Sequence, residues 1–214
     1  MSEAPALAPG HDCPVCPRLV QFRQAIRTKQ PQWHNAPVPS FGRDDARLLI
    51  VGLAPGLKGA NRTGRPFTGD YAGDLLYATL KDFGWARGDY GREPDDGFEL
   101  VDCRITNAVR CVPPENKPTP LEIASCRPFL VEEIASLAKL KAILALGSIA
   151  HASVLRTLGE RLAEHPFRHR AIHRMKNGLL LADSYHCSRY NTNTGRLTPA
   201  MFQVVFAQLR DRLA

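Results

Sequence analysis

Short apolar runs alternate with longer amphipathic segments along the chain. Four of these runs predict buried strands, over residues 47–51, 99–109, 141–147 and 179–184. Between and around them, hydrophobic residues recur at helical spacing. Those segments predict helices over residues 19–30, 70–84, 119–138, 148–159 and 198–214.

Local signals mark several helix ends. Residues 119–122 have the pattern of a capping box, with Pro120 at the first helical position. Thr198 and Pro199 open the last helix, and Gly84 is typical of a helix stop. These signals support the helix boundaries that the periodicity predicts.

Strands that alternate with helices indicate a parallel sheet covered by helices on both faces. We therefore predict an α/β fold with a central parallel sheet of about four strands flanked by helices. We expect a single domain over residues 1–214, in which residues 1–12 form a loose N-terminal tail. In such folds, functional loops follow the carboxyl ends of strands. By position these are residues 52–70, 107–118 and 185–197.

Composition narrows the class of protein. Of the 214 residues, 44% are hydrophobic and 23% charged, which excludes wholesale disorder. No window approaches eighteen consecutive apolar residues, so no transmembrane helix and no membrane partner are expected. Residues 1–12 have neither the basic start nor the apolar core of a signal peptide, so we expect a cytoplasmic protein. We also expect it to be a monomer.

The charge balance favours a polyanionic partner. The chain has 28 Lys and Arg against 21 Asp and Glu, a net charge of +7. This excess is typical of nucleic-acid-binding proteins. A basic protein with no anionic ligand is the alternative.

The first of the three loops is rich in glycine, which permits close backbone approach. Its glycines are Gly52, Gly56, Gly59, Gly64 and Gly69. The loop matches neither GxGxxG nor GxxxxGK[ST], so the common nucleotide-binding fingerprints are absent. By itself it is as consistent with a structural turn as with a binding site.

Two strand-end side chains are candidates for chemistry. Asn107 offers an amide donor and a carbonyl acceptor in one plane, which suits the edge of a base. His186 is of the type used for electrophilic or general-acid work at neutral pH. Taken alone, Asn107 could equally cap a turn, and a single loop histidine is more often uninvolved.

The six cysteines are unlikely to form disulfides in a chain that lacks a secretion signal. Cys13 and Cys16 form a CxxC pair, whereas fourteen residues lie between Cys111 and Cys126. A Cys₄ zinc site usually has two tight pairs, and iron–sulfur spacing is looser. Zinc, an iron–sulfur cluster and buried free thiols all remain open at this point.

Residues 156–176 carry six basic residues against two glutamates. This segment is either a phosphate-contact patch or a solvated basic face. His165, His169 and His173 recur within it at spacings of four. Pro166 and the lack of a helical pattern argue against a metal site there.

Together these residues resemble the uracil-DNA glycosylase superfamily, and in particular its family 5 type, the iron–sulfur-containing enzymes of bacteria and archaea. The first motif is GLAPGLKGANRTGRPFTGD over residues 52–70, and the second is HCSRYNTNTGRLT over residues 186–198. ITNAVRC over residues 105–111 and the later Cys126 also fit. The order and spacing of these pieces extend the resemblance from Cys13 to the last helix.

The resemblance implies a uracil-DNA glycosylase-like fold and a uracil pocket. Phe67 would stack on the flipped base, and Asn107 would hydrogen-bond the pyrimidine edge. His186 would face the base oxygen that gains negative charge, while Asp70 would position the water or stabilise the sugar cation. The substrate-binding positions also include the strand-end residues Gly52, Leu53 and Ala54.

The resemblance also implies a [4Fe–4S] cluster on Cys13, Cys16, Cys111 and Cys126, and a partner in double- or single-stranded DNA that contains uracil. The cluster is expected to be structural. DNA contacts are expected from Arg62, Arg65, Ser188, Arg189, Tyr190 and Asn191. The last three are candidates for a wedge that fills the hole left by the flipped base.

One position departs from other families of the superfamily, which place Asp, Asn or Glu second in the first motif. Leu53 stands there and can do no acid–base work, so Asp70 is the candidate for activating water. A non-catalytic nucleic-acid-binding module with a Cys₄ metal site is the main alternative function. An α/β enzyme acting on free nucleotides is disfavoured because no phosphate-loop fingerprint is present.

Overall fold

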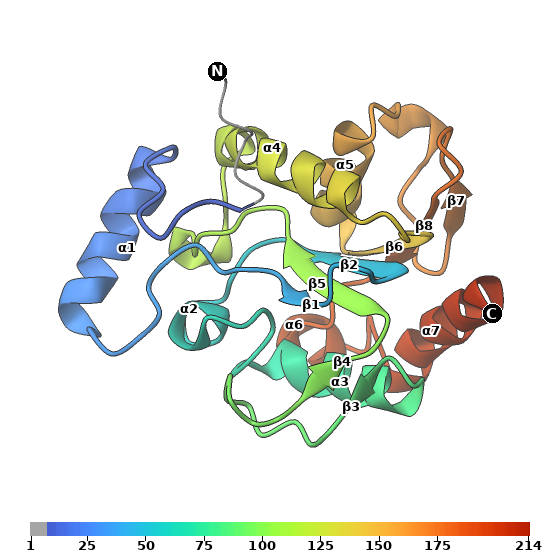
Figure 1. Ribbon diagram of the computed structural model, residues 1–214, viewed down its shortest axis with the longest axis horizontal. Coiled ribbons are helices and arrows are strands. Elements are labelled where there is room, and N and C mark those ends of the chain that lie inside the picture. Colours follow the sequence, from blue (N-terminus) through green and yellow to red (C-terminus); the bar gives the residue numbers. More distant parts are fainter. Residues whose placement is uncertain (1–7) are drawn as a thin grey trace.

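The computed structural model describes residues 8–214, which are arranged around a six-stranded mixed sheet (Figure 1). In spatial order its strands are β1 (Phe41–Gly42), β5 (Cys103–Asn107), β2 (Leu48–Gly52), β6 (Ala142–Leu146), β8 (Leu180–Ser184) and β7 (Ile172–Arg174). The four central strands are parallel, as predicted, and β1 and β7 pair antiparallel at the two edges. These edge strands have two and three residues, too few to show a period in the sequence.

Helices cover both faces of the sheet because successive strand residues point in opposite directions. Leu48 and Ile50 pack with α3 (Tyr71–Asp82) and α7 (Pro199–Leu213). Leu49 and Val51 pack with α4 (Pro120–Ser136) and α5 (Ser148–Thr157) on the other face. Figure 1 shows α4 and α5 on one side of the sheet and α3 on the other. Burial on both faces explains why β2 has no alternating pattern.

The predicted helix ends are confirmed. The Thr119 hydroxyl accepts from the Glu122 backbone N–H at 3.2 Å, and the Glu122 carboxylate accepts from the Thr119 N–H at 2.7 Å. The Thr198 hydroxyl caps α7 by accepting from the Met201 N–H at 3.2 Å. Gly84 follows α3 with φ +77°, a conformation in which glycine ends helices at little cost.

The predicted strand over residues 99–109 is wrong in its extent. It is divided into β4 (Glu99–Leu100) and β5, with Asp102 between them at φ +53°. The Asp102 carboxylate fixes this turn by accepting from the Arg47 backbone N–H at 2.9 Å. β4 instead pairs with β3 (Ala86–Arg87) in a separate two-stranded sheet.

Three short or peripheral helices complete the fold. They are α1 (Pro17–Lys29), α2 (Ala60–Thr63) and α6 (Arg189–Asn193). The predicted tail over residues 1–12 falls partly outside the described residues, which begin at residue 8. No helix within residues 8–214 is both long and apolar enough to cross a bilayer.

Candidate active site

The loops that follow β2, β5 and β8 meet at the carboxyl edge of the sheet and line one open cleft of about 570 Å³. The cleft brings together eight of the predicted site residues: Leu53, Ala54, Phe67, Asp70, Asn107, His186, Ser188 and Arg189. Asn107 and His186, which are far apart in sequence, therefore open into the same cavity. This arrangement follows from parallel strands, whose carboxyl ends lie at one edge.

Gly52 ends β2 behind the cleft and lets two side chains come close. A Cβ at this position would lie 2.4 Å from the Asn107 Oδ1 and 2.7 Å from the Phe67 ring. Gly52 is therefore a spacing residue and does not line the cleft. The Asn107 Oδ1 is buried and has no hydrogen-bond partner among residues 8–214. A buried amide oxygen without a partner is costly, which suits an acceptor that waits for a ligand.

Asp70 caps the amino end of α3 inside the cleft. Its carboxylate accepts from the Gly73 N–H at 3.3 Å, and the helix end favours negative charge there. Burial nevertheless raises the pKa of Asp70 above the usual carboxyl range, with the backbone N–H bonds opposing the shift. Gly56 and Gly59 make room for it, since a Cβ at Gly59 would lie 2.4 Å from the carboxylate.

The His186 imidazole lies beside the Phe67 ring, with ring centroids 5.9 Å apart and an angle of 29°. Burial lowers the pKa of His186 to about 4, so the ring is neutral at pH 7. The Asn191 side chain donates to the His186 carbonyl at 2.8 Å and fixes the loop that carries the ring.

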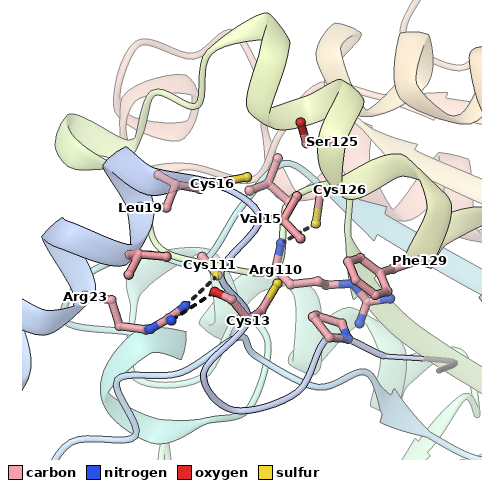
Figure 2. A pocket seen from close by; sticks show the side chains of 13 residues that line it. Cys13, Val15, Cys16, Leu19, Arg23, Arg110, Cys111, Ser125, Cys126 and Phe129 are labelled. Carbon is pink, nitrogen blue, oxygen red and sulfur yellow. Dashed lines mark hydrogen bonds between the residues drawn. The ribbon is translucent and has the colours of Figure 1, made fainter. Parts of the chain in front are cut away.

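Four cysteines line a second pocket, between the start of α1, the end of β5 and α4 (Figure 2). They are Cys13, Cys16, Cys111 and Cys126, the predicted metal ligands. Burial, followed by repulsion from neighbouring thiols, raises the pKa of Cys16 to about 11. Four thiols that face one pocket are a donor set for zinc or for an iron–sulfur cluster, because soft metals prefer thiolate.

Buried arginines surround these thiols. Arg23 donates to the Cys111 Sγ at 3.4 Å and to the Cys13 carbonyl at 3.1 Å, and its Nε has no partner among the described residues. The Arg110 N–H donates to the Cys126 Sγ at 3.4 Å. A buried guanidinium beside thiols fits a site that gains negative charge, and this agrees with ligation as thiolates.

Comparison with known proteins identifies the family. The family model of the uracil DNA glycosylase superfamily matches residues 39–210. The chain belongs to this superfamily. A type-5 uracil-DNA glycosylase of Thermus thermophilus is 44% identical over 208 residues, covering 94% of both chains. Those of Mycobacterium leprae and Pyrobaculum aerophilum are 43% and 40% identical, covering 91% and 87% of this chain and 88% and 83% of those proteins.

The resemblance to the uracil-DNA glycosylase superfamily drawn from the sequence is thereby confirmed, and so is the α/β fold. Two of the predicted DNA-contact residues, Arg62 and Arg65, do not line the cleft. Arg65 is 5% exposed and holds Asp96 through two hydrogen bonds of 2.8 and 2.7 Å, so in this structure it is not available to DNA. Arg62 is paired with Glu93 at 3.0 Å and does not line the cleft.

The predicted DNA-contact residues in the loop after His186 differ in what their side chains contact. Ser188 caps α6 and accepts from the Asn191 N–H. The Arg189 guanidinium lies over the Tyr71 ring at 5.4 Å, at the cleft lining. Tyr190 is 72% exposed, which is unusual for a large aromatic side chain. Arg189 contacts Tyr71 and Asn191 donates to the His186 carbonyl, whereas the Tyr190 side chain extends into solvent. Tyr190 is therefore the wedge candidate best placed to enter the duplex.

The cleft lining that the sequence did not indicate includes Lys58, Tyr71 and Asn116. Asn116 comes from the segment after β5 and has φ +57°. No motif or spacing pattern indicates Asn116, because the surrounding residues have the composition of a proline-rich loop. Tyr71 is the first residue of α3 and is 38% exposed.

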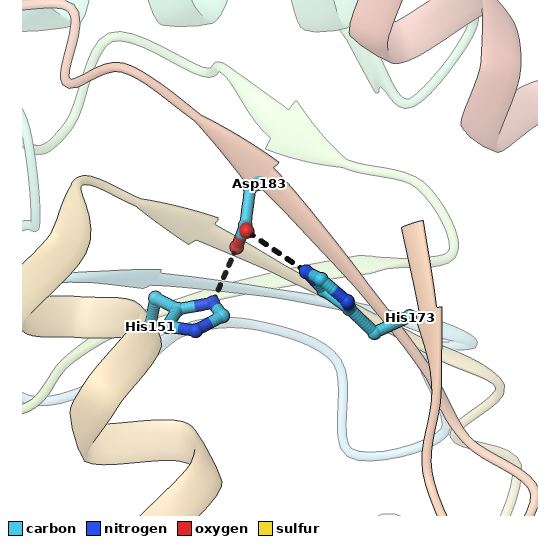
Figure 3. A group of neighbouring side chains, drawn as sticks. All are labelled: His151, His173 and Asp183. Carbon is cyan, nitrogen blue, oxygen red and sulfur yellow. Dashed lines mark hydrogen bonds and ion pairs between the residues drawn. The ribbon is translucent and has the colours of Figure 1, made fainter. Parts of the chain in front are cut away.

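A buried carboxylate between two histidines is a further feature that the sequence did not indicate (Figure 3). Asp183 on β8 lies 2.7 Å from the His151 Nδ1 and 3.2 Å from the His173 Nε2. Two ligands of one tetrahedral zinc ion would lie about 3.3 Å apart, so 2.7 Å fits a hydrogen bond better than shared coordination. The His151 Nε2 also faces the His165 carbonyl, at 2.8 Å. Both ring nitrogens of His151 therefore face an oxygen atom.

Proposed function

We propose that the protein excises uracil from DNA by hydrolysing the N-glycosidic bond and leaves an abasic site. The observation that carries this proposal is the single cleft that joins Phe67, Asp70, Asn107 and His186. Relatives that are named type-5 uracil-DNA glycosylases and align over most of the chain support it.

Base recognition requires that the nucleotide leave the stack, because an enzyme cannot reach the glycosidic bond inside a duplex. The Phe67 ring, at 7% exposure, offers a rigid apolar face for the flipped base. The partnerless Asn107 Oδ1 and its amide group are suited to the polar edge of the pyrimidine. Tyr190 would fill the space that the base vacates.

Bond cleavage sends the electron pair of the C1′–N1 bond onto the base, so uracil leaves as an anion and the sugar gains positive charge. A neutral His186 can donate an N–H to the base oxygen where this charge collects. Donors arranged in advance of the reaction are commonly worth about 3–4 kcal/mol of transition-state stabilisation. A strong nucleophile is not needed.

Water must then add its oxygen to C1′ and lose a proton. We assign Asp70 to this step, because Leu53 has no group that can accept a proton. Asp70 as carboxylate can orient the water and offset the positive sugar. Its raised pKa makes it a better proton acceptor than an ordinary exposed carboxylate.

The four cysteines would hold a [4Fe–4S] cluster in the second pocket. When bound, this group would act as a structural cross-link between the start of α1, the end of β5 and α4. Arg23 and the Arg110 N–H would donate hydrogen bonds to its cysteine sulfurs. Analysis of the purified protein for iron and acid-labile sulfide distinguishes the cluster from zinc. A brown protein that contains both indicates the cluster, and a colourless protein that contains zinc indicates a zinc site.

The deciding experiment incubates the protein with duplexes that contain uracil or thymine and measures abasic sites. Uracil duplex is expected to yield them. His186→Ala and Asn107→Ala should slow excision by about 10²–10³-fold while changing affinity for undamaged duplex far less. Salt-dependent binding without release of any base would instead favour the non-catalytic module.

A further inference from the structure

Two arginines in a turn before β7 have no role in the chemistry above. Arg168 and Arg170 are both exposed, and no acidic side chain pairs with either among the described residues. Other exposed arginines do have such partners, for example Arg87 with Glu99. The turn therefore carries positive charge that the protein itself does not neutralise.

The surrounding sequence reinforces this excess. Between Glu164 and Asp211 the chain has a single carboxylate, Asp183, whose exposure is 0%. The oxygens of this buried carboxylate lie within hydrogen-bond distance of His151 and His173. No carboxylate in this stretch is thus available to the surface arginines. An ordinary solvated surface would instead carry charges of both signs.

Asp183 also fixes the turn on the sheet. Its side chain accepts from the Arg168 backbone N–H at 3.3 Å, and its carbonyl accepts from the Arg170 N–H at 2.8 Å. Arg170 has φ +72°, a strained conformation that such bonds must hold in place. Because Asp183 lies near the carboxyl end of β8, the turn is held at the edge of the sheet where the cleft opens.

A stack of side chains joins the turn to the active-site loop. The Tyr185 ring lies 4.9 Å from the His169 ring at an angle of 11°, and the Arg196 guanidinium lies 4.7 Å from the Tyr185 ring centroid. Tyr185 immediately precedes His186, which lines the cleft. Arg196 is exposed and also lacks an acidic partner among residues 8–214.

We propose that Arg168, Arg170 and Arg196 form a phosphate-binding strip that holds the DNA backbone beside the cleft. The inference rests on the proposed function only in taking DNA as the polyanion. Guanidinium groups that extend from a fixed backbone and are free of carboxylates suit phosphate oxygens, which they bind through paired N–H donors. Such contacts position the duplex without reading its sequence.

The test measures the affinity of undamaged duplex DNA as a function of salt concentration. Each lost phosphate contact lowers the slope of log K against log salt by about 0.9. The double variant Arg168→Ala/Arg170→Ala is expected to lower the slope by about 1.8. The matched control is Arg174→Ala, which removes an exposed and unpaired arginine next to Leu180, at the other end of β8. The control should leave the slope unchanged.

If Arg174→Ala lowered the slope by half as much as the double variant, every arginine would contribute equally wherever it lies. That result would indicate unspecific attraction and would overturn the proposed strip. An unchanged slope in the double variant would overturn it as well. Because binding to undamaged DNA is measured, the result does not depend on uracil excision. Failure of the proposed enzyme activity would be seen separately, as the absence of abasic sites. Circular dichroism of each variant confirms that the fold is retained.

Discussion

The missing side chain of Gly52 determines where the Asn107 carboxamide can lie: a Cβ on Gly52 would be 2.4 Å from the Asn107 Oδ1. The two residues end neighbouring strands and are paired in register. The cleft therefore depends on a close approach of the Asn107 and Phe67 side chains to the backbone of β2 that only glycine permits.

Gly52→Ala should consequently lower the single-turnover rate of uracil excision by about 100-fold, because a displacement of about 1 Å at a reacting group has this effect. Gly10→Ala is the matched control, since a Cβ there would meet nothing within 4 Å. Similar rates for Gly52→Ala and wild type would contradict the account of the cleft.

The pH dependence of excision should reflect a neutral His186. Burial lowers the pKa of His186 to about 4, so the ring gains its proton only when the pH falls through that region. The rate should therefore show no inflection near pH 6.5, where an exposed histidine titrates. Burial raises the pKa of Asp70, so protonation of this carboxylate should reduce the rate at a pH above the ordinary carboxyl range. A single-turnover profile checks both, and an inflection near 6.5 that disappears in His186→Ala would refute the assignment.

Arg23→Gln should weaken retention of the proposed [4Fe–4S] cluster. Arg23 is 2% exposed and donates to the Cys111 sulfur, and a charged hydrogen bond of this kind is worth about 1.5–3 kcal/mol. We expect iron to be released about tenfold faster or more in the presence of a chelator, followed by absorbance. Arg27→Gln is the control, because Arg27 lies on the same helix but pairs with the exposed Asp12. Equal release from both variants would argue against the role of Arg23.

Asp183→Asn should destabilise the fold by about 1–3 kcal/mol, as expected when a buried hydrogen-bonding group is left without a suitable partner. The change keeps the shape of the side chain but replaces one of the two oxygens that face His151 and His173 with an amide donor. Urea unfolding provides the measurement. Asp211→Asn, at an exposed position, should change the free energy of unfolding by no more than about 0.5 kcal/mol. Comparable stability of the two variants would mean that the carboxylate contributes little.

The sequence predicts the central architecture well because the signals are local. Buried strands such as β6 appear as unbroken apolar runs, and the Thr119 capping box marks the start of α4 within one residue. The edge strands β1 and β7 escape prediction because their pairing is decided by distant partners. The same holds for the turn at Asp102, which is stabilised by a hydrogen bond from the backbone N–H of Arg47, in another segment.

The site was predictable only in part, for a related reason. Residues in the two motifs, such as Phe67 and His186, could be assigned from the resemblance. The burial of Arg65 could not, because it depends on Asp96, thirty-one residues away, whose pKa the guanidinium hydrogen bond lowers to about 2. The Asp183 network was missed since its three side chains come from α5, β7 and β8 and share no sequence pattern.

Only three residues separate the two sites along the chain: Asn107 lies in the cleft, and Cys111 lies in the thiol pocket. Between them, the Ala108 and Val109 N–H groups donate to the Gly52 and Leu53 carbonyls at 2.9 Å, so the segment is held rigidly. A displacement of the Cys111 thiol would therefore be transmitted to the Asn107 carboxamide, so the geometry of the thiol pocket and the geometry of the cleft are coupled.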